Sequence, residues 1–137
     1  MKRSVRFELY IRHTMNSIMT ENGHKIYDLT ALIDMYSGNM DNVKGTLVIF
    51  IDQMRKDVTM LKQKFSEKDY PSVKAFAHRM KPNLKLFGMN EMHLLVLDIE
   101  QAALESNAAA LDAQLTHLYA LAEIACVRMQ IEVIDRV

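Results

Sequence analysis

The longest apolar pattern in the chain runs from Val43 to Phe65 and repeats with the period of an α-helix. Its members recur at intervals of three and four residues and are Val43, Leu47, Phe50, Ile51, Met54, Val58, Leu61 and Phe65. This spacing places the apolar side chains on one face of about six helical turns, with charged residues elsewhere. The pattern therefore predicts one long helix whose apolar face packs against a core.

Composition favours helices for the rest of the chain as well. Of the 137 residues 50% are hydrophobic, and only 4 are glycine and 2 proline, whereas 11 are methionine. Turn-rich β folds use more glycine and proline, so an all-α domain is expected, and the length suits one domain rather than two. Short loops between the predicted helices imply antiparallel neighbours, and hence an antiparallel up-down four-helix bundle.

Local signals mark the ends of the other helices. Asp28 is a plausible N-cap for a short helix that ends at Ser37-Gly38-Asn39, and Asn90 is expected to cap a later one. The last helix carries a heptad-like seam of Leu111, Leu115, Leu118, Ala122, Ala125 and Met129. This seam could close the bundle or extend beyond it to form a dimer.

The first twenty residues have two interpretations. Alternation as in a β-strand links Val5, Phe7, Leu9 and Ile11. Helical spacing instead links Phe7, Tyr10 or Ile11, Met15 and Ile18. We favour an additional N-terminal helical segment, because no partner strand is visible elsewhere. The Asn22-Gly23 turn signal then separates an accessory segment, residues 1–24, from a bundle domain over residues 25–137.

Charge and cysteine usage exclude several classes of partner. Lys plus Arg equals Asp plus Glu at 17 each, so no overall field attracts nucleic acid or an anionic membrane. The single Cys126 excludes an internal disulfide and a cysteine zinc cluster.

No apolar run reaches the length of a membrane span and no continuous signal-peptide core is present, so a soluble cytoplasmic protein is expected. No metal site is expected from histidines, since His13, His24, His93 and His117 lack the i, i+4 spacing of a helical site.

A second helical stripe, from about Tyr70 to Gly88, turns one histidine away from the core. Its apolar positions are Val73, Phe76, Ala77, Met80, Leu84 and Phe87. His78 points to the other side, where Lys74, Lys81 and Lys85 are its helical neighbours. Nearby positive charge favours the neutral imidazole, which is the nucleophilic form. A phosphoryl group on that ring would carry negative charge. Lys81 could pair with this charge, and so could Lys74 or Lys85.

Three stretches resemble the histidine-containing phosphotransfer (HPt) family. Ala77-His78-Arg79-Met80-Lys81-Pro82 is similar to the family's active-helix pattern A-H-x-L-K-G. The run from Met35 to Asp41 followed by Phe50 resembles the entry to its second helix, and Ile99-Glu100 resembles its downstream I/L-E pair. Pro82 departs from the pattern, because the family usually has glycine there.

The resemblance implies a phosphorelay intermediate built on a four-helix bundle. His78 would be the phosphoacceptor and Lys81 would hold the phosphate, with Lys74, Pro82 and Lys85 as further binding residues. Partners would be response-regulator receiver domains, including one in a hybrid sensor kinase, and magnesium would come with the receiver. The chain has no glycine-rich phosphate loop, so it is not expected to be an enzyme that loads its histidine from ATP.

Two other functions stay open. Because Pro82 alters the helix beside the histidine, the chain could be an interaction module that binds receivers without accepting phosphate. The C-terminal seam permits a third function, a dimerising structural bundle.

Overall fold

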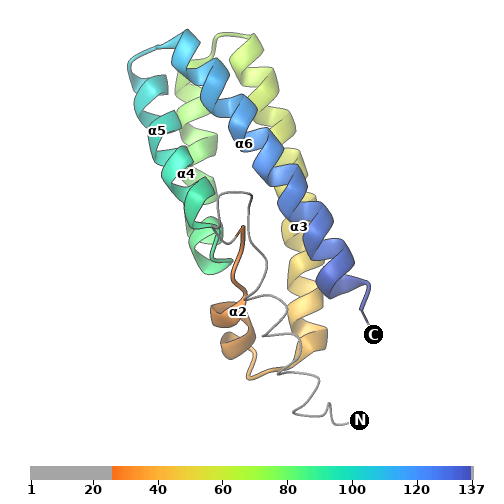
Figure 1. Ribbon diagram of the computed structural model, residues 1–137. Helices are drawn as coiled ribbons and strands as arrows, with labels where there is room; N and C mark the ends of the chain where they lie inside the picture. Colours follow the sequence, from red (N-terminus) through yellow and green to blue (C-terminus); the bar gives the residue numbers. More distant parts are fainter. Residues whose placement is uncertain (1–25, 137) are drawn as a thin grey trace.

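The structure is a computed structural model that describes residues 26–136, and every regular element in this range is a helix. In chain order these are α2 (Thr30–Met35), α3 (Met40–Ser66), α4 (Tyr70–Leu86), α5 (Asn90–Leu104), α6 (Ala108–Met129) and a π-helical stretch, η1 (Gln130–Ile134), that continues α6. The long helices α3 to α6 stand side by side, and α2 lies near one end of them (Figure 1). The predicted all-α bundle is confirmed. The predicted helical segment over residues 1–24 lies outside the described residues, so the domain boundary after it stays a prediction.

Contacts between α3 and α4 show that the two helices run in opposite directions. As the position advances along α3, the partner residue moves back toward the start of α4. The pairs are Phe50 with Phe87, ring centroids 4.0 Å apart; Asp57 Oδ1 with Arg79 Nη2, 3.9 Å apart; and Phe65 with Tyr70, ring centroids 6.4 Å apart. The short connection over residues 67–69 makes this arrangement the natural one.

Helix α6 closes the bundle against α3, again in the opposite direction. The Lys44 ammonium donates to the Arg136 carbonyl, Arg55 Nη2 lies 3.3 Å from Glu123 Oε1, and Lys62 Nζ lies 4.9 Å from the centre of the Tyr119 ring. The seam of α6 is buried throughout, and its members are Leu111, Leu115, Leu118, Ala122, Ala125 and Met129. The seam therefore closes the bundle, and a dimer through α6 would have to use another face.

The apolar stripes form the core as predicted, except that three of their members are only partly buried. On α3 the buried members are Val43, Leu47, Phe50, Ile51, Met54 and Leu61, whereas Val58 and Phe65 are partly buried. On α4, Phe76 is only partly buried, although the pattern placed it with the core residues. It lies at the edge of the apolar face, where the Arg79 guanidinium covers its ring at 4.5 Å from the centroid.

Two predicted N-caps are wrong by one residue. Helix α2 begins at Thr30 with Leu29 as its N-cap; Asp28 Oδ1 instead accepts from the N–H of Thr30 at 3.0 Å and from its hydroxyl at 2.6 Å. Asn90 is the first residue of α5, and Met89 is the N-cap without a side-chain hydrogen bond. In both cases the backbone before the helix is already engaged, since Asp28 N–H donates to the Phe87 carbonyl and Met89 N–H to the Leu84 carbonyl.

Gly88 allows the end of α4 to pack against the segment before α2. Its φ is +64°, in the left-handed region that favours glycine. A Cβ atom at this position would lie 2.5 Å from the Asp28 carbonyl oxygen, which is closer than real Cβ contacts allow. The glycine thus lets two backbone segments meet at the end of the bundle where α4 turns into α5.

Candidate functional site

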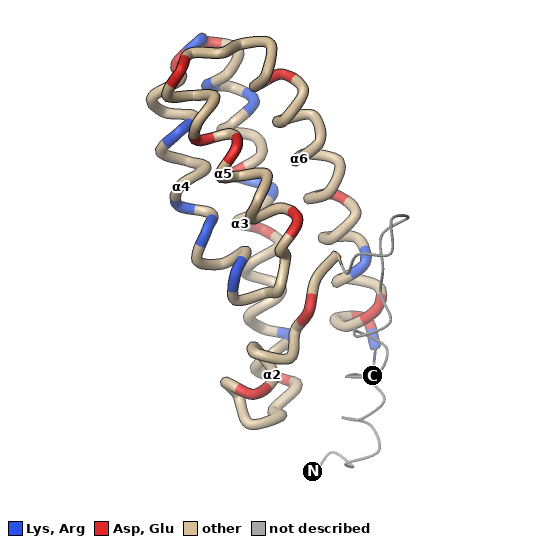
Figure 2. The backbone as a smooth tube through the Cα atoms, turned by 60° about the vertical axis from the view of Figure 1, so that its left-hand side comes forward, with Lys and Arg blue, Asp and Glu red and all other residues tan. Residues whose placement is uncertain are grey.

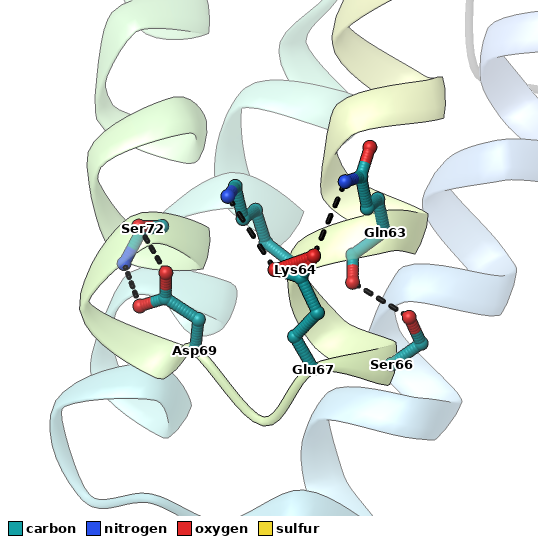
Figure 3. Close-up of polar contacts among 6 residues, drawn as sticks. All are labelled: Gln63, Lys64, Ser66, Glu67, Asp69 and Ser72. Atoms are coloured by element: carbon teal, nitrogen blue, oxygen red, sulfur yellow. Dashed lines mark hydrogen bonds and ion pairs between the residues drawn. The ribbon is translucent and has the colours of Figure 1, made fainter.

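The helix that carries His78 begins at a capped turn (Figure 3). Asp69 is the N-cap of α4, and its carboxylate accepts from the Ser72 hydroxyl at 2.7 Å and from the Ser72 N–H at 3.2 Å. These hydrogen bonds, the one from the hydroxyl first, hold the pKa of Asp69 below its usual range. Pro71 occupies the first turn, where its missing N–H costs nothing. The start of α4, and with it the direction in which His78 points, is thereby defined.

His78 lies on the face of α4 opposite the core. The helix buries Val73, Ala77, Met80 and Leu84, whereas the side chain of His78 is 68% exposed. This outward orientation agrees with the helical periodicity of the sequence. The imidazole is therefore accessible to another protein.

A carboxylate from the neighbouring helix α5 joins His78 to Lys81. Glu100 Oε2 lies 3.2 Å from His78 Nδ1, and Glu100 Oε1 lies 2.8 Å from Lys81 Nζ. The Glu100 side chain is largely covered, with 14% of its surface exposed. The helical face alone suggested that only cations surround His78. In the folded protein an anion, the Glu100 carboxylate, also lies against the ring.

Two opposing effects act on the pKa of Glu100. Partial burial raises the pKa, but the contacts with Lys81 and His78 outweigh it and hold the pKa below the usual range of a glutamate. The carboxylate is therefore ionised at neutral pH. An ionised carboxylate only accepts hydrogen bonds, so Nδ1 is the ring nitrogen that carries the proton in this contact. In the neutral ring the lone pair then lies on Nε2, which faces away from Glu100.

The other predicted site residues surround His78 at different distances along α4. Lys74 and Lys85 are exposed, one turn before and two turns after the histidine, while Lys81 is partly covered. Figure 2 shows the basic positions following one another along α4 beside acidic positions on α5. Pro82 is exposed within α4, and the helix continues past it to Leu86.

An apolar groove borders His78 on the side of α5. It has a volume of about 760 Å³ and is lined by Pro71, Lys74, Ala75, His78, Arg79, Ala103, Leu104 and Ser106. The groove combines the first half of α4 with the end of α5. Of the predicted binding residues it includes Lys74, but neither Pro82 nor Lys85.

Sequence reasoning missed two participants in this site. Glu100 was noticed only as part of a motif, and Leu104 was not singled out at all. The motif could have identified Glu100, since a resemblance that extends to an acidic residue after the active helix suggests a role for it. Nothing in the local pattern could have identified Leu104, because its importance comes from the groove between two helices.

Other kinds of site receive no support from the described part of the chain. No helix within residues 26–136 has the length and hydropathy that a membrane crossing requires. In the same range no three His, Cys, Asp or Glu side chains gather to bind a metal ion.

A four-helix bundle that exposes an imidazole, held by a carboxylate on one side and open on the other, is suited to carrying a group on histidine. The model of the family described as Hpt domain matches residues 45–132, and the chain belongs to this family. Hpt domains are phosphotransfer modules of phosphorelays, without an ATP site of their own and with receiver domains as partners. No curated protein and no solved structure shows significant similarity to the chain.

Proposed function

We propose that His78 accepts a phosphoryl group from the phospho-aspartate of one receiver domain and passes it to the aspartate of another. The observation that carries this proposal is the contact between Glu100 Oε2 and His78 Nδ1, which leaves Nε2 free on an exposed face. In the first transfer Nε2 attacks the phosphorus, a P–N bond forms, and the P–O bond to the aspartate breaks, so that a free carboxylate leaves. The second transfer reverses these bond changes on another receiver.

Glu100 is a positioning residue in this scheme. The imidazole gains positive charge as Nε2 donates its lone pair to phosphorus, and a carboxylate at Nδ1 stabilises that charge. The same contact holds the ring in one tautomer and one orientation, as a carboxylate does for histidines in other sites.

Lys81 is the residue we expect to pair with the phosphate. Its ammonium lies one helical turn from His78 and is already held near the ring by Glu100. A phosphoryl group on Nε2 would offer it a second anion, and Lys74 and Lys85 extend the positive charge along the exposed face. Pro82 presents a small rigid apolar surface next to these lysines, where a receiver could pack.

We propose that one of the two receiver domains belongs to a hybrid sensor kinase. We also propose that magnesium enters the complex with the receiver. A buried free thiol at Cys126 agrees with the reducing cytoplasm as the place of action.

The test is transfer of labelled phosphate from a phosphorylated receiver domain. We expect label that is acid-labile and base-stable, as for a phosphoramidate, and expect it to be lost in His78→Gln. His117→Gln is the matched control, since His117 is also exposed and paired with a glutamate, Glu91, at 3.7 Å. Label that persists in His78→Gln, or its absence from the wild type with several receivers, would refute the relay.

The competing function is an interaction module that binds receivers without taking phosphate. The observation in its favour is Pro82, which removes the N–H that would bond the His78 carbonyl one turn back. We expect Pro82 to be compatible with transfer. Pro82→Gly decides: if this variant accepts phosphate about a hundredfold faster than the wild type, a barrier difference of about 2.7 kcal/mol, the proline obstructs transfer and the interaction module is the better function.

A further inference from the structure

The C-terminal half of α6, with η1, is apolar on two opposite faces. One face is the buried seam that closes the bundle. On the other, Ile124, Val127 and Ile131 recur at steps of three and four residues and are 45%, 40% and 59% exposed. Ala120, one turn earlier, is exposed as well. A surface helix usually carries polar side chains on its outer face, so this face has the composition of one that another element covers.

The same apolar surface continues onto α3. Val48 is 51% exposed and lies one turn after Lys44, on the edge of α3 that faces α6. Contacts on both sides of Val48 establish this position. The Lys44 ammonium donates to the Arg136 carbonyl, and Arg55 Nη2 lies 3.3 Å from Glu123 Oε1. The surface, which we call the outer patch, consists of Val48, Ala120, Ile124, Val127 and Ile131.

The outer patch lies away from His78. Helix α6 packs against α3 and α5, and α4 packs against the same two helices, so α4 and α6 stand at opposite corners of the bundle. An occupant of the outer patch therefore leaves the exposed imidazole on α4 accessible. The two surfaces can be used at the same time.

We propose that residues 7–18 of the same chain dock on the outer patch as an amphipathic helix. The helical stripe in this segment consists of Phe7, Ile11, Met15 and Ile18. Its ends are eleven positions apart, as are Ala120 and Ile131 at the ends of the patch on α6. Eleven positions of helix rise about 16 Å, so the two apolar stripes match in length. This inference is independent of the proposed function, because it involves neither the histidine nor a receiver.

The described chain begins beside the outer patch. Tyr27 is fully buried, and its hydroxyl donates to Glu132 Oε2 at 3.3 Å. Glu132 directly follows Ile131 of the patch. The seven residues that connect Ile18 to Ile26 reach about 25 Å when extended, and they contain the predicted Asn-Gly turn. This connection is long enough for the segment to turn back along α6.

The size of the outer patch favours this segment over a second copy of the chain. A stable protein–protein interface uses about 20–30 residues from each partner, whereas the patch offers five apolar side chains. One amphipathic helix presents a single stripe of about this size. Because the segment is tethered to the bundle, its effective concentration at the patch is about millimolar, and weak contacts suffice to hold it there.

Trypsin cleavage at Arg12 measures whether the segment is docked. Cleavage requires release of the segment from the patch, so its rate follows the undocked fraction. We expect Ile124→Ser to raise this rate about tenfold, the effect of losing one buried isoleucine contact. Leu94→Ser is the matched control, because Leu94 is 63% exposed on α5, and it should change the rate by less than about twofold. Equal rates at Arg12 in wild type and Ile124→Ser would overturn the proposal.

A nitroxide attached to Asn16→Cys locates the segment on a patch that carries no substitution. Asn16 lies on the polar side of the predicted helix, and Cys126 is buried, so the reagent modifies the introduced thiol. We expect the nitroxide to broaden the amide signals from Ile124 to Ile131 and to leave those of α4 unchanged. Absence of broadening on α6, or broadening of α4 to the same extent, would contradict docking on the outer patch.

A mixing experiment distinguishes docking within one chain from docking between two copies. Isotope-labelled wild type is mixed with unlabelled protein that carries the nitroxide. We expect the signals of α6 in the wild type to stay sharp, because each patch is occupied by the segment of its own chain. Broadened signals of α6 in this mixture would assign the outer patch to a second copy and overturn the proposal.

Discussion

The Glu100 carboxylate lies 3.2 Å from Nδ1 of His78, across the interface between α5 and α4. The contact joins two helices, so its geometry depends on how these helices pack. In the neutral ring it places the proton on Nδ1 and leaves Nε2 on the side away from Glu100. The site is thereby more than an exposed histidine on a basic helix.

Replacing Glu100 with glutamine should slow transfer to His78. The amide keeps the shape and an acceptor oxygen but loses the charge, and a hydrogen bond to a charged group contributes about 1.5–3 kcal/mol. We expect a decrease in transfer rate of about tenfold, together with a changed tautomer ratio in the nitrogen NMR spectrum of the ring. Glu91→Gln is the control, because Glu91 Oε1 lies 3.7 Å from His117 Nε2 on the same helix as Glu100. A slower rate in both variants would argue against a specific role for Glu100.

The stability of the fold should depend on the ionisation of Glu100. Its folded pKa is depressed, so its contacts stabilise the protein above the unfolded value of about 4.3 and are lost as pH falls through the lower folded value. The difference in free energy of unfolding between wild type and Glu100→Gln should therefore shrink from about pH 7 to about pH 3. Urea unfolding at several pH values measures it. A difference that stays constant with pH would mean that the charge of Glu100 does not stabilise the fold.

Lys81→Ala should slow phosphotransfer more than Lys85→Ala. Lys81 Nζ is held 2.8 Å from Glu100 Oε1 and lies one turn from His78, whereas an i+7 neighbour lies about 10 Å along the axis. Transfer rates from one receiver measure both. The reverse order would assign the phosphate contact to Lys85.

Phe50→Ala should destabilise the bundle more than Phe76→Ala. Phe50 is 5% exposed and its ring centroid lies 4.0 Å from that of Phe87, so its removal leaves a cavity that costs about 3–5 kcal/mol. Phe76 is only partly buried, and we expect about half that loss for its truncation. Denaturant unfolding followed by circular dichroism measures both variants. Equal losses would mean that Phe76 contributes to the core as the sequence pattern suggested.

Two glycines should respond to alanine in opposite directions. Gly88→Ala forces a Cβ atom into the left-handed region and against the Asp28 carbonyl, so we expect a loss of at least about 2 kcal/mol. Gly45 lies inside α3, and a Cβ atom added to it would have nothing within 4 Å, so Gly45→Ala should stabilise the protein by up to about 1 kcal/mol. Thermal unfolding of the two variants provides the comparison. A stable Gly88→Ala protein would show that the contact with Asp28 is easily displaced.

Local periodicity was sufficient to predict the helices and their buried faces. The stripe of α3, the outward direction of His78 and the seam of α6 all follow from spacings of three and four residues within one segment, which the geometry of a helix converts into a face. Helix ends were less certain for a physical reason. At Asp28 and Met89 the backbone bonds to a distant or preceding segment before the helix begins, and this shifted the caps by one residue.

The sequence by itself thus determined which face of α4 carries His78 and the lysines beside it. Only the tertiary structure decided what surrounds them: Glu100 lies 22 positions from His78, and Leu104 reaches the same site from the next turn of α5. Their approach depends on how α5 is rotated and placed against α4, and the packing of the whole core sets both. The periodicity of a single helix carries no information about that rotation, because it describes each helix by itself.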